Sequence, residues 1–187
     1  MRVLGIDPGS TATGFGVVER AGPSVVHRAH GTLRPPRGAA LAVRLATILD
    51  GLSAVIEAHA PEVVVIERVF VAASPRSALV LGQARGVAMA SAAARGVPVV
   101  EYAPSQIKQA VVGTGAASKR QVQAMVRTLL ALSAAPPQDA ADALAAAICH
   151  AHAGRLATLL EGEAPGARRG RGRGRRGGRG YVVRRAR

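Results

Sequence analysis

The chain has 187 residues, enough for one domain of ordinary size, and it carries a formal net charge of +14. Hydrophobic residues make up 49% of it and aromatic residues only 2%, so the core must be built from Ala, Val, Leu and Ile. The single cysteine, Cys149, excludes an internal disulfide and is expected in the core. Because there is neither a signal-peptide pattern nor an apolar run of about 18 residues, we expect a cytoplasmic protein without a membrane segment.

The positive charge is concentrated at the end of the sequence. Residues 163–187 contain ten Arg and one Glu, a net charge of +9, which leaves +5 for residues 1–162. We predict a globular domain over residues 1–160 and a disordered Arg/Gly-rich tail over 161–187. Nucleic acid is the polyanion that such a distribution favours, although a low-complexity extension without function explains the tail equally well.

The order of predicted elements indicates an α/β fold. Short apolar or β-branched runs predict strands over residues 3–6, 13–19, 24–33, 62–68 and 97–102. Helical spacing and helix-start residues predict helices over residues 36–60, 74–94, 104–112, 118–132 and 136–160. The first three strands are joined by short connections, which favours antiparallel pairing. The fourth follows a long helix and should therefore run parallel to the first.

Two of these strands end in an acid. Asp7 follows a buried strand and precedes the turn Pro8-Gly9, and Glu67 ends the strand over 62–68 in the same way. Parallel neighbouring strands would bring the two carboxylates side by side, where mutual repulsion calls for a cation or a catalytic purpose. Two alternatives remain open at this stage: Asp7 caps its own turn, or the two side chains point to opposite faces.

A second pair of acids starts the last predicted helix. Asp139 and Asp142 are three residues apart and so share one helix face, although stabilisation of the helix N-terminus explains each of them singly. Carboxylates gathered at one sheet edge provide the hard oxygen ligands that a pair of Mg²⁺ ions requires for phosphodiester hydrolysis. His150 and His152 are two apart and are interpreted as helix-end polar residues rather than a metal pair.

Scarce residue types give further candidates. Only Lys108 and Lys119 among 25 basic residues are lysines, which favours a need for an ammonium group beside a phosphate, against chance and solvation. Phe70 is one of four aromatic residues and follows Glu67 closely. It could stack on an unpaired base or pack beneath its own loop.

The sequence resembles the RuvC family of bacterial Holliday-junction resolvases, in the ribonuclease H-like superfamily. The resemblance covers about residues 1–155. It rests on the motifs GIDPGSTATGFGVV, VVVIERVF, SALVLGQARGVA, EYAPSQIKQAVVGTGAASKRQVQAMV and DAADALAAAICHAH. It implies a five-stranded mixed sheet, with three antiparallel strands followed by two parallel ones, flanked by helices. It also implies a homodimer that nicks four-way DNA junctions symmetrically and leaves 5′-phosphate ends.

Residue roles follow from the same resemblance. Asp7, Glu67, Asp139 and Asp142 fall on the four metal-binding acids of the family, which hold two Mg²⁺ per site, with Mn²⁺ able to substitute. The resemblance places Lys108 and Lys119 at DNA-binding or cleavage positions and Phe70 near the bases, and we also expect Arg76 and Arg120 to contact DNA. The sequence departs from the family pattern at Ala73, at Ser74 and in the tail.

The hypothesis is therefore a junction-resolving endonuclease of recombination and repair. In it, Asp7 lies between two Mg²⁺ ions, Lys119 neutralises phosphate charge in the transition state, and the helix from Ser77 to Ala94 forms the dimer face. The RuvA–RuvB branch-migration complex is the expected partner. A phosphotransferase related to actin-like ATPases and a non-catalytic nucleic-acid-binding protein that relies on its tail are the two rivals.

Overall fold

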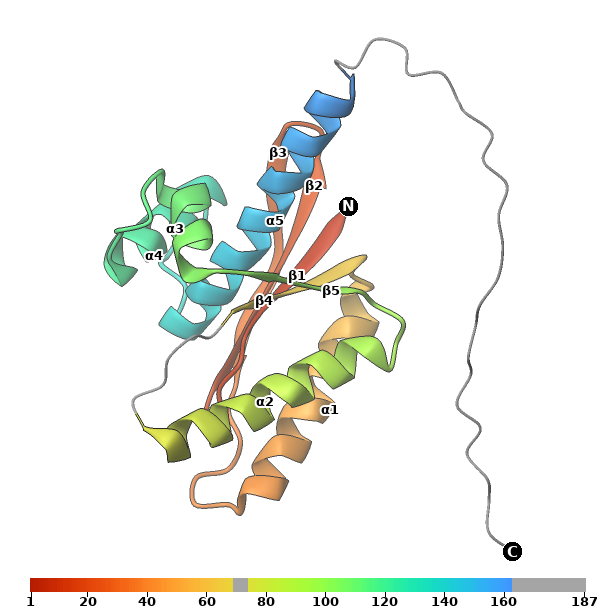
Figure 1. The fold of residues 1–187 in the computed structure, drawn as a ribbon, viewed down its shortest axis with the longest axis vertical. Coiled ribbons are helices and arrows are strands. Elements are labelled where there is room, and N and C mark those ends of the chain that lie inside the picture. Colours follow the sequence, from red (N-terminus) through yellow and green to blue (C-terminus); the bar gives the residue numbers. More distant parts are fainter. Residues whose placement is uncertain (69–73, 163–187) are drawn as a thin grey trace, which may run out of the picture.

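A five-stranded mixed sheet forms the centre of the molecule. The computed structural model describes residues 1–68 and 74–162, and Figure 1 shows the sheet between two groups of helices. The strands are β1 (Arg2–Asp7), β2 (Thr13–Ala21), β3 (Ser24–Leu33), β4 (Val63–Glu67) and β5 (Val99–Tyr102). They lie in the order β3-β2-β1-β4-β5. β1, β2 and β3 are antiparallel, whereas β4 and β5 run parallel to β1. The predicted sheet is confirmed.

The helices divide between the two faces of this sheet. They are α1 (Leu41–His59), α2 (Pro75–Ala93), α3 (Pro104–Val112), α4 (Lys119–Leu129) and α5 (Gln138–Gly162). In Figure 1, α1 and α2 lie on one side and α3, α4 and α5 on the other. Within the described residues, no helix combines the length and the apolarity that a membrane-spanning segment needs.

Side-chain alternation along the strands builds a separate core on each face. Leu4 and Ile66 pack with α1 and α2 in one buried cluster, whereas Val3 and Val65 pack with α3, α4 and α5 in the other. Cys149 is 4% exposed in the second cluster, which confirms its predicted core position. Successive residues of a strand point to opposite faces, so each strand serves both cores.

Glycines let α5 lie unusually close to β1 and β2. A Cβ atom at Gly5 would clash with the backbone carbonyl of Ala143, and one at Gly14 would clash with that of Asp139. A side chain at Gly16 would collide with Leu144. Because these strand positions carry no side chain, the α5 backbone packs directly on the strands.

Several predicted helix boundaries need correction. α1 begins at Leu41 rather than at residue 36, because Pro35, Pro36 and the left-handed Gly38 (φ 74°) hold the preceding segment out of the helix. α5 begins two residues later than predicted, and the carbonyl of Pro137 accepts its first helical hydrogen bond, from Ala141. α4 ends at Leu129, ahead of Ala131, whose φ of 49° is not helical.

The other end of α5 extends past the predicted boundary at residue 160, to Gly162. His150 and His152 therefore lie well inside α5, and their description as helix-end residues is wrong. The predicted disorder of the tail falls on residues 163–187, outside the described residues.

Replacing Gly5 by Ala should destabilise the protein, because the new methyl group pushes α5 off the sheet. Overpacking of this kind costs about 1–3 kcal/mol. The matched control is Gly86→Ala in α2, where a Cβ would meet nothing within 4 Å. There the better helix propensity of Ala should add about 0.5–1 kcal/mol of stability. Urea denaturation of both variants measures the two opposite effects, and equal stabilities would contradict the close packing of α5.

Candidate metal centre

Asp7 and Glu67 are the last residues of neighbouring parallel strands. The register pairs Ile6 with Ile66, so the two acids lie one step further along in the same register. Asp7 is four residues after Val3 and Glu67 is two residues after Val65, so each acid points to the same face of the sheet as its valine. Both valines face α5. The two carboxylates therefore share the α5 face of the sheet, which excludes the alternative that they point to opposite faces.

α5 brings the other two acids over this edge. Asp139 lies in the first turn of α5 and Asp142 one turn later. The backbone of Asp139 packs on Gly14, which pairs with Asp7 across β1 and β2. The close packing of α5 on the sheet therefore delivers the second pair of acids to the carboxyl ends of β1 and β4.

Charge repulsion among these acids is visible in their protonation. Burial, followed by the negative charges of Asp142, Glu67 and Asp139, raises the pKa of Asp7 from 3.8 to about 7, whereas the charge of Lys119 acts in the opposite direction. Burial and the charge of Asp142 also raise the pKa of Glu67.

The same electrostatics bear on the capping interpretation of Asp142. Burial raises the pKa of Asp142, although Lys119 opposes this effect. Stabilisation by a helix N-terminus favours the charged carboxylate and would lower the pKa, so capping does not dominate the environment of Asp142.

Thr13, rather than Asp7, holds the turn after β1. The fully buried Thr13 hydroxyl donates a hydrogen bond to the Gly9 carbonyl (2.7 Å) and accepts one from the Gly9 N–H (3.3 Å). Among the described residues, none forms a hydrogen bond with the Asp7 carboxylate. The turn-cap interpretation of Asp7 is therefore wrong, and its oxygens are left available to a cation.

Both lysines lie beside the acids. A cavity of about 210 Å³ is lined by Lys108, Lys119, Glu67 and Asp142, among others. The Lys119 ammonium lies 3.4 Å from a carboxylate oxygen of Asp142 and donates a hydrogen bond to it. This cavity therefore combines two carboxylates, which can bind a metal ion, with two ammonium groups, which can bind a phosphate.

Two basic residues near the acids escaped the sequence prediction. The guanidinium of Arg34, just after β3, lies 3.6 Å from a carboxylate oxygen of Asp139. Arg44 of α1 also reaches this region and donates a hydrogen bond to the Ser10 hydroxyl at 3.4 Å. Neither stands out in a sequence that uses arginine almost everywhere, so composition gave no signal for them.

For the remaining predicted site residues, the structure shows no contact with the four acids among the described residues. Arg76 is exposed in the first turn of α2, where Ser74 caps the helix by accepting a hydrogen bond from the Ser77 N–H. Arg120 lines a different cavity, of about 510 Å³, which none of the four acids lines. Phe70 and Ala73 lie outside the described residues.

The two histidines of α5 bind different partners. A ring nitrogen of His150 and the hydroxyl of Tyr102 form a hydrogen bond of 2.9 Å, whereas His152 lies 3.4 Å from the carbonyl of Ala110. Each histidine thus contacts a different element, β5 or α3.

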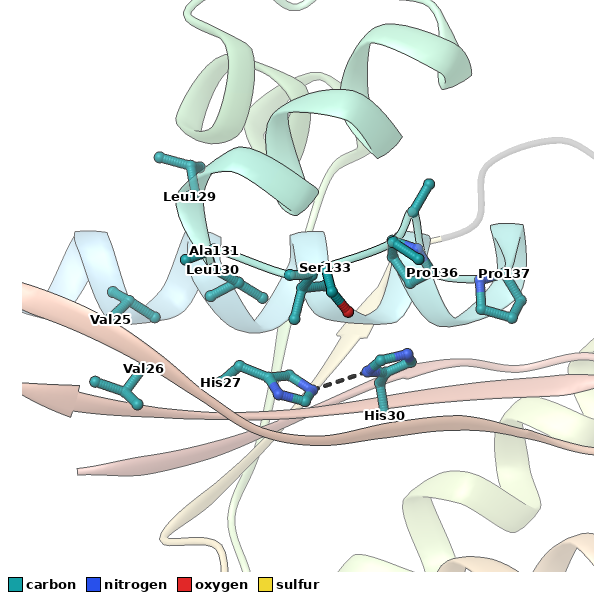
Figure 2. Close-up of a pocket in the computed structure, with 13 residues that line it drawn as sticks. Val25, Val26, His27, His30, Leu129, Leu130, Ala131, Ser133, Pro136 and Pro137 are labelled. Atoms are coloured by element: carbon teal, nitrogen blue, oxygen red, sulfur yellow. Dashed lines mark hydrogen bonds between the residues drawn. The ribbon is translucent and has the colours of Figure 1, made fainter.

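A larger cavity has no acidic residue in its lining. It measures about 720 Å³ and lies between β3 and residues 129–137 (Figure 2). The rings of His27 and His30 meet there at a nitrogen–nitrogen distance of 2.8 Å. No carboxylate lines this cavity, so the chemistry is assigned to the smaller, charged one.

The donor set of the four acids suits a hard divalent cation. All of the donors are carboxylate oxygens, and the pKa of Asp7 is raised first by burial and then by the neighbouring negative charges, which a cation would neutralise. As the side chains lie, no three His, Cys, Asp or Glu residues in the described ranges already form a metal-binding group. Two of the acids, Asp139 and Asp142, instead contact basic side chains. The residues fit the ion once those side chains reorient.

Replacing Asp7 by Asn should stabilise the metal-free protein at pH 8. Between the unfolded pKa of 3.8 and the folded pKa of about 7, the folded state keeps a proton that the unfolded chain has released, so stability falls as pH rises. Asn removes this penalty, which we set at about 1–3 kcal/mol after allowing for partial solvent exposure.

Thermal unfolding in a chelator measures this effect. The gain should be roughly 3–10 °C at pH 8 and should shrink toward pH 4. Asp50→Asn, at an exposed position of α1, is the control and should have little effect. If the parent protein is equally stable from pH 5 to pH 8 and the variant is no more stable than the parent, the pKa of Asp7 is not raised by the fold.

Comparison with known proteins identifies the family. Residues 3–150 match the family model described as crossover junction endodeoxyribonuclease RuvC. The chain is 52% identical over 165 residues to the RuvC protein of Burkholderia lata, covering 88% of this chain and 91% of the relative. It is 51% identical over 177 residues to that of Burkholderia vietnamiensis, covering 95% and 98%.

A solved structure agrees with this match. Thermus thermophilus RuvC in complex with a Holliday junction substrate superimposes with a TM-score of 0.79 and 37% sequence identity, covering 84% of this chain and 97% of that one. With a family model over most of its length and relatives at about half identity, the chain belongs to the RuvC family of crossover junction endodeoxyribonucleases.

Proposed function

We propose that this protein resolves Holliday junctions by cutting two strands symmetrically, with hydrolysis directed by the four acids described above. The observation that carries the proposal is the convergence of Asp7, Glu67, Asp139 and Asp142 at one sheet edge, where burial and repulsion raise the pKa of Asp7 to about 7. Membership of the RuvC family supplies the substrate class, and the Thermus relative was solved with a Holliday junction bound.

The other three acids approach Asp7 from two different elements. Asp7 interacts electrostatically with all three of the others, which supports a ligand set in which Asp7 would be the central carboxylate. Glu67 comes from β4 on one side, whereas Asp139 and Asp142 come from α5. Two Mg²⁺ ions held in this way, or Mn²⁺ in their place, would activate water and stabilise the leaving oxygen of the phosphodiester, which leaves a 5′-phosphate.

Protonation of Asp7 controls whether the site can be loaded. A carboxylate must release its proton before it can act as a ligand. Since the pKa of Asp7 lies near 7, the metal-free site at neutral pH still holds part of a proton. The apparent affinity for Mg²⁺ should therefore rise as pH increases from 6 to 8.

Lys108 and Lys119 act on the phosphate. Both line the cavity that contains Glu67 and Asp142, and an ammonium is a compact charge that needs no bidentate geometry. Lys119 contacts Asp142 in the metal-free protein. With DNA bound, it stabilises the negative charge that develops on the scissile phosphate. Arg76, Arg120 and Phe70 complete the proposed DNA-binding set.

A two-fold dimer accounts for paired cutting. The proposed dimer face lies on α2, where Leu79 leaves 71% of its surface exposed although it is a large apolar residue. Two-fold symmetry would present two equivalent sites to the two related strands of a four-way junction. In the cytoplasm, the RuvA–RuvB branch-migration complex would supply the junction.

Asp7→Asn should abolish cleavage of a synthetic four-way junction, because it removes the ligand shared by both ions. Titration with Mg²⁺ on the junction, beside a linear duplex of the same sequence, measures both metal dependence and structural selectivity. We expect a loss of at least about 10²-fold in rate, and parent-like cleavage by Asp50→Asn. A variant that resolves junctions at the parent's rate would refute the proposal.

Leu79→Asp should weaken the dimer, since it places a charge in the proposed apolar contact. Sedimentation of the parent and the variant over a range of concentrations measures the change. The control is Val43→Asp, which alters a residue of α1 that is 52% exposed and should leave the dimer intact. If Leu79→Asp and the parent sediment alike, the dimer face lies elsewhere.

A further inference from the structure

We propose that Arg34 is a phosphate-binding residue that Asp139 holds in the metal-free protein and that metal binding releases toward the DNA backbone. The proposal deepens the proposed function and rests on it, because it assigns a DNA contact beside the same acids. It concerns a residue that the sequence prediction did not include.

The fold places Arg34 at the edge of the metal centre. β3 ends at Leu33, which pairs with Thr13 at the start of β2. The next residue of β2, Gly14, packs on the backbone of Asp139. Arg34 therefore emerges where α5 begins, and its guanidinium lies 3.6 Å from the Asp139 carboxylate.

This ion pair is easily exchanged. The Arg34 side chain is 64% exposed and that of Asp139 is 35% exposed, and exposed pairs of this kind contribute little to stability. A divalent cation that takes up the oxygens of Asp139 carries more charge than the guanidinium and forms shorter contacts. Binding of the ion would therefore displace Arg34 without significant loss to the fold.

Once displaced, Arg34 is suited to a phosphate. The guanidinium presents a planar fork of donors that matches phosphate oxygens, and it stays charged at any working pH. The sheet order places β3 on one side of Asp7 and β4 on the other. Lys119 serves Asp142 and Glu67 on the β4 side, so Arg34 supplies the positive charge on the β3 side. A DNA strand crossing the centre would then be held from both sides.

Two opposite effects of Arg34→Gln follow. Removing a cation that competes for Asp139 should tighten metal binding by about two- to five-fold, which corresponds to the worth of an exposed ion pair. Junction affinity should fall more with metal than without it, by about the same two- to five-fold factor, because without metal Asp139 competes with the phosphate for the guanidinium. The loss of one phosphate contact should also reduce the slope of log affinity against log salt by about 0.9.

Arg37→Gln is the matched control. Arg37 lies in the same connection between β3 and α1, is exposed, and forms no ion pair with a described residue. The Arg37→Gln substitution removes one positive charge, as Arg34→Gln does, but it breaks no ion pair with an acid. The control separates a contact specific to Arg34 from the general effect of one positive charge fewer.

The experiment combines two binding measurements on the full chain. Calorimetry with Mn²⁺ in the absence of DNA gives the metal affinity. Fluorescence anisotropy with a labelled four-way junction, in EDTA and in Ca²⁺, gives the junction affinity, and a gel confirms that the junction is intact. We expect Arg34→Gln alone to combine tighter metal binding with a penalty on junction affinity that is larger in Ca²⁺ than in EDTA.

Two outcomes would overturn the proposal. One is an unchanged metal affinity, and the other is a penalty on junction affinity that is equal in EDTA and Ca²⁺ or equal to that of Arg37→Gln. Failure of the proposed function itself would look different, because the parent protein would then bind neither Mn²⁺ nor the junction selectively.

Discussion

The close packing of α5 on β1 and β2 is the constraint on which the site depends. Asp7 is fixed by its strand, but Asp139 and Asp142 reach it only because α5 lies almost directly on the strand backbones. Gly5, Gly14 and Gly16 permit this approach. A methyl group at any of them would lift the helix and withdraw two of the four acids. Residues with no functional groups therefore determine the geometry of the charged ones.

This arrangement places electrostatic strain in the folded protein. Burial, followed by repulsion among the acids, raises the pKa of Asp7 to about 7, a cost that a bound cation would relieve. The charge of Lys119 opposes this shift, and Lys119 and Arg34 also form ion pairs with Asp142 and Asp139. The proposed function and the stability of the metal-free fold would thus oppose each other here, as is common at functional sites.

Much of the fold was predictable from the sequence. The strands came from short apolar runs, and the position of Glu67 beside Asp7 came from the rule that a helix usually joins parallel strands. What a single sequence could not provide was register: the shared face of the two acids depends on the pairing of Ile6 with Ile66. Helix starts were predicted too early where Pro and Gly competed with an apolar pattern, as before Leu41.

The residues of the candidate site could likewise be predicted only in part. Asp7, Glu67, Asp139 and Asp142 could be recognised because acids are scarce in this chain, these four lie at element ends, and the family motifs contain them. Arg34 could not, because arginine is too frequent here for any one copy to stand out. Its contact with Asp139 depends on the end of β3 lying beside the start of α5, residues more than a hundred positions apart. Only the folded chain shows such a contact.

The length of α5 fixes the distance between the four acids and the start of the Arg-rich sequence. From Asp139 to Gly162 the helix rises by about 35 Å, at 1.5 Å per residue. Figure 1 shows its far end well away from the start of α5. The Arg-rich sequence after Gly162 thus begins at a distance from Asp139 that equals about ten base-pair steps, at 3.4 Å per step. Within one chain, α5 therefore sets the four acids and the most basic part of the sequence apart by about one turn of a DNA duplex.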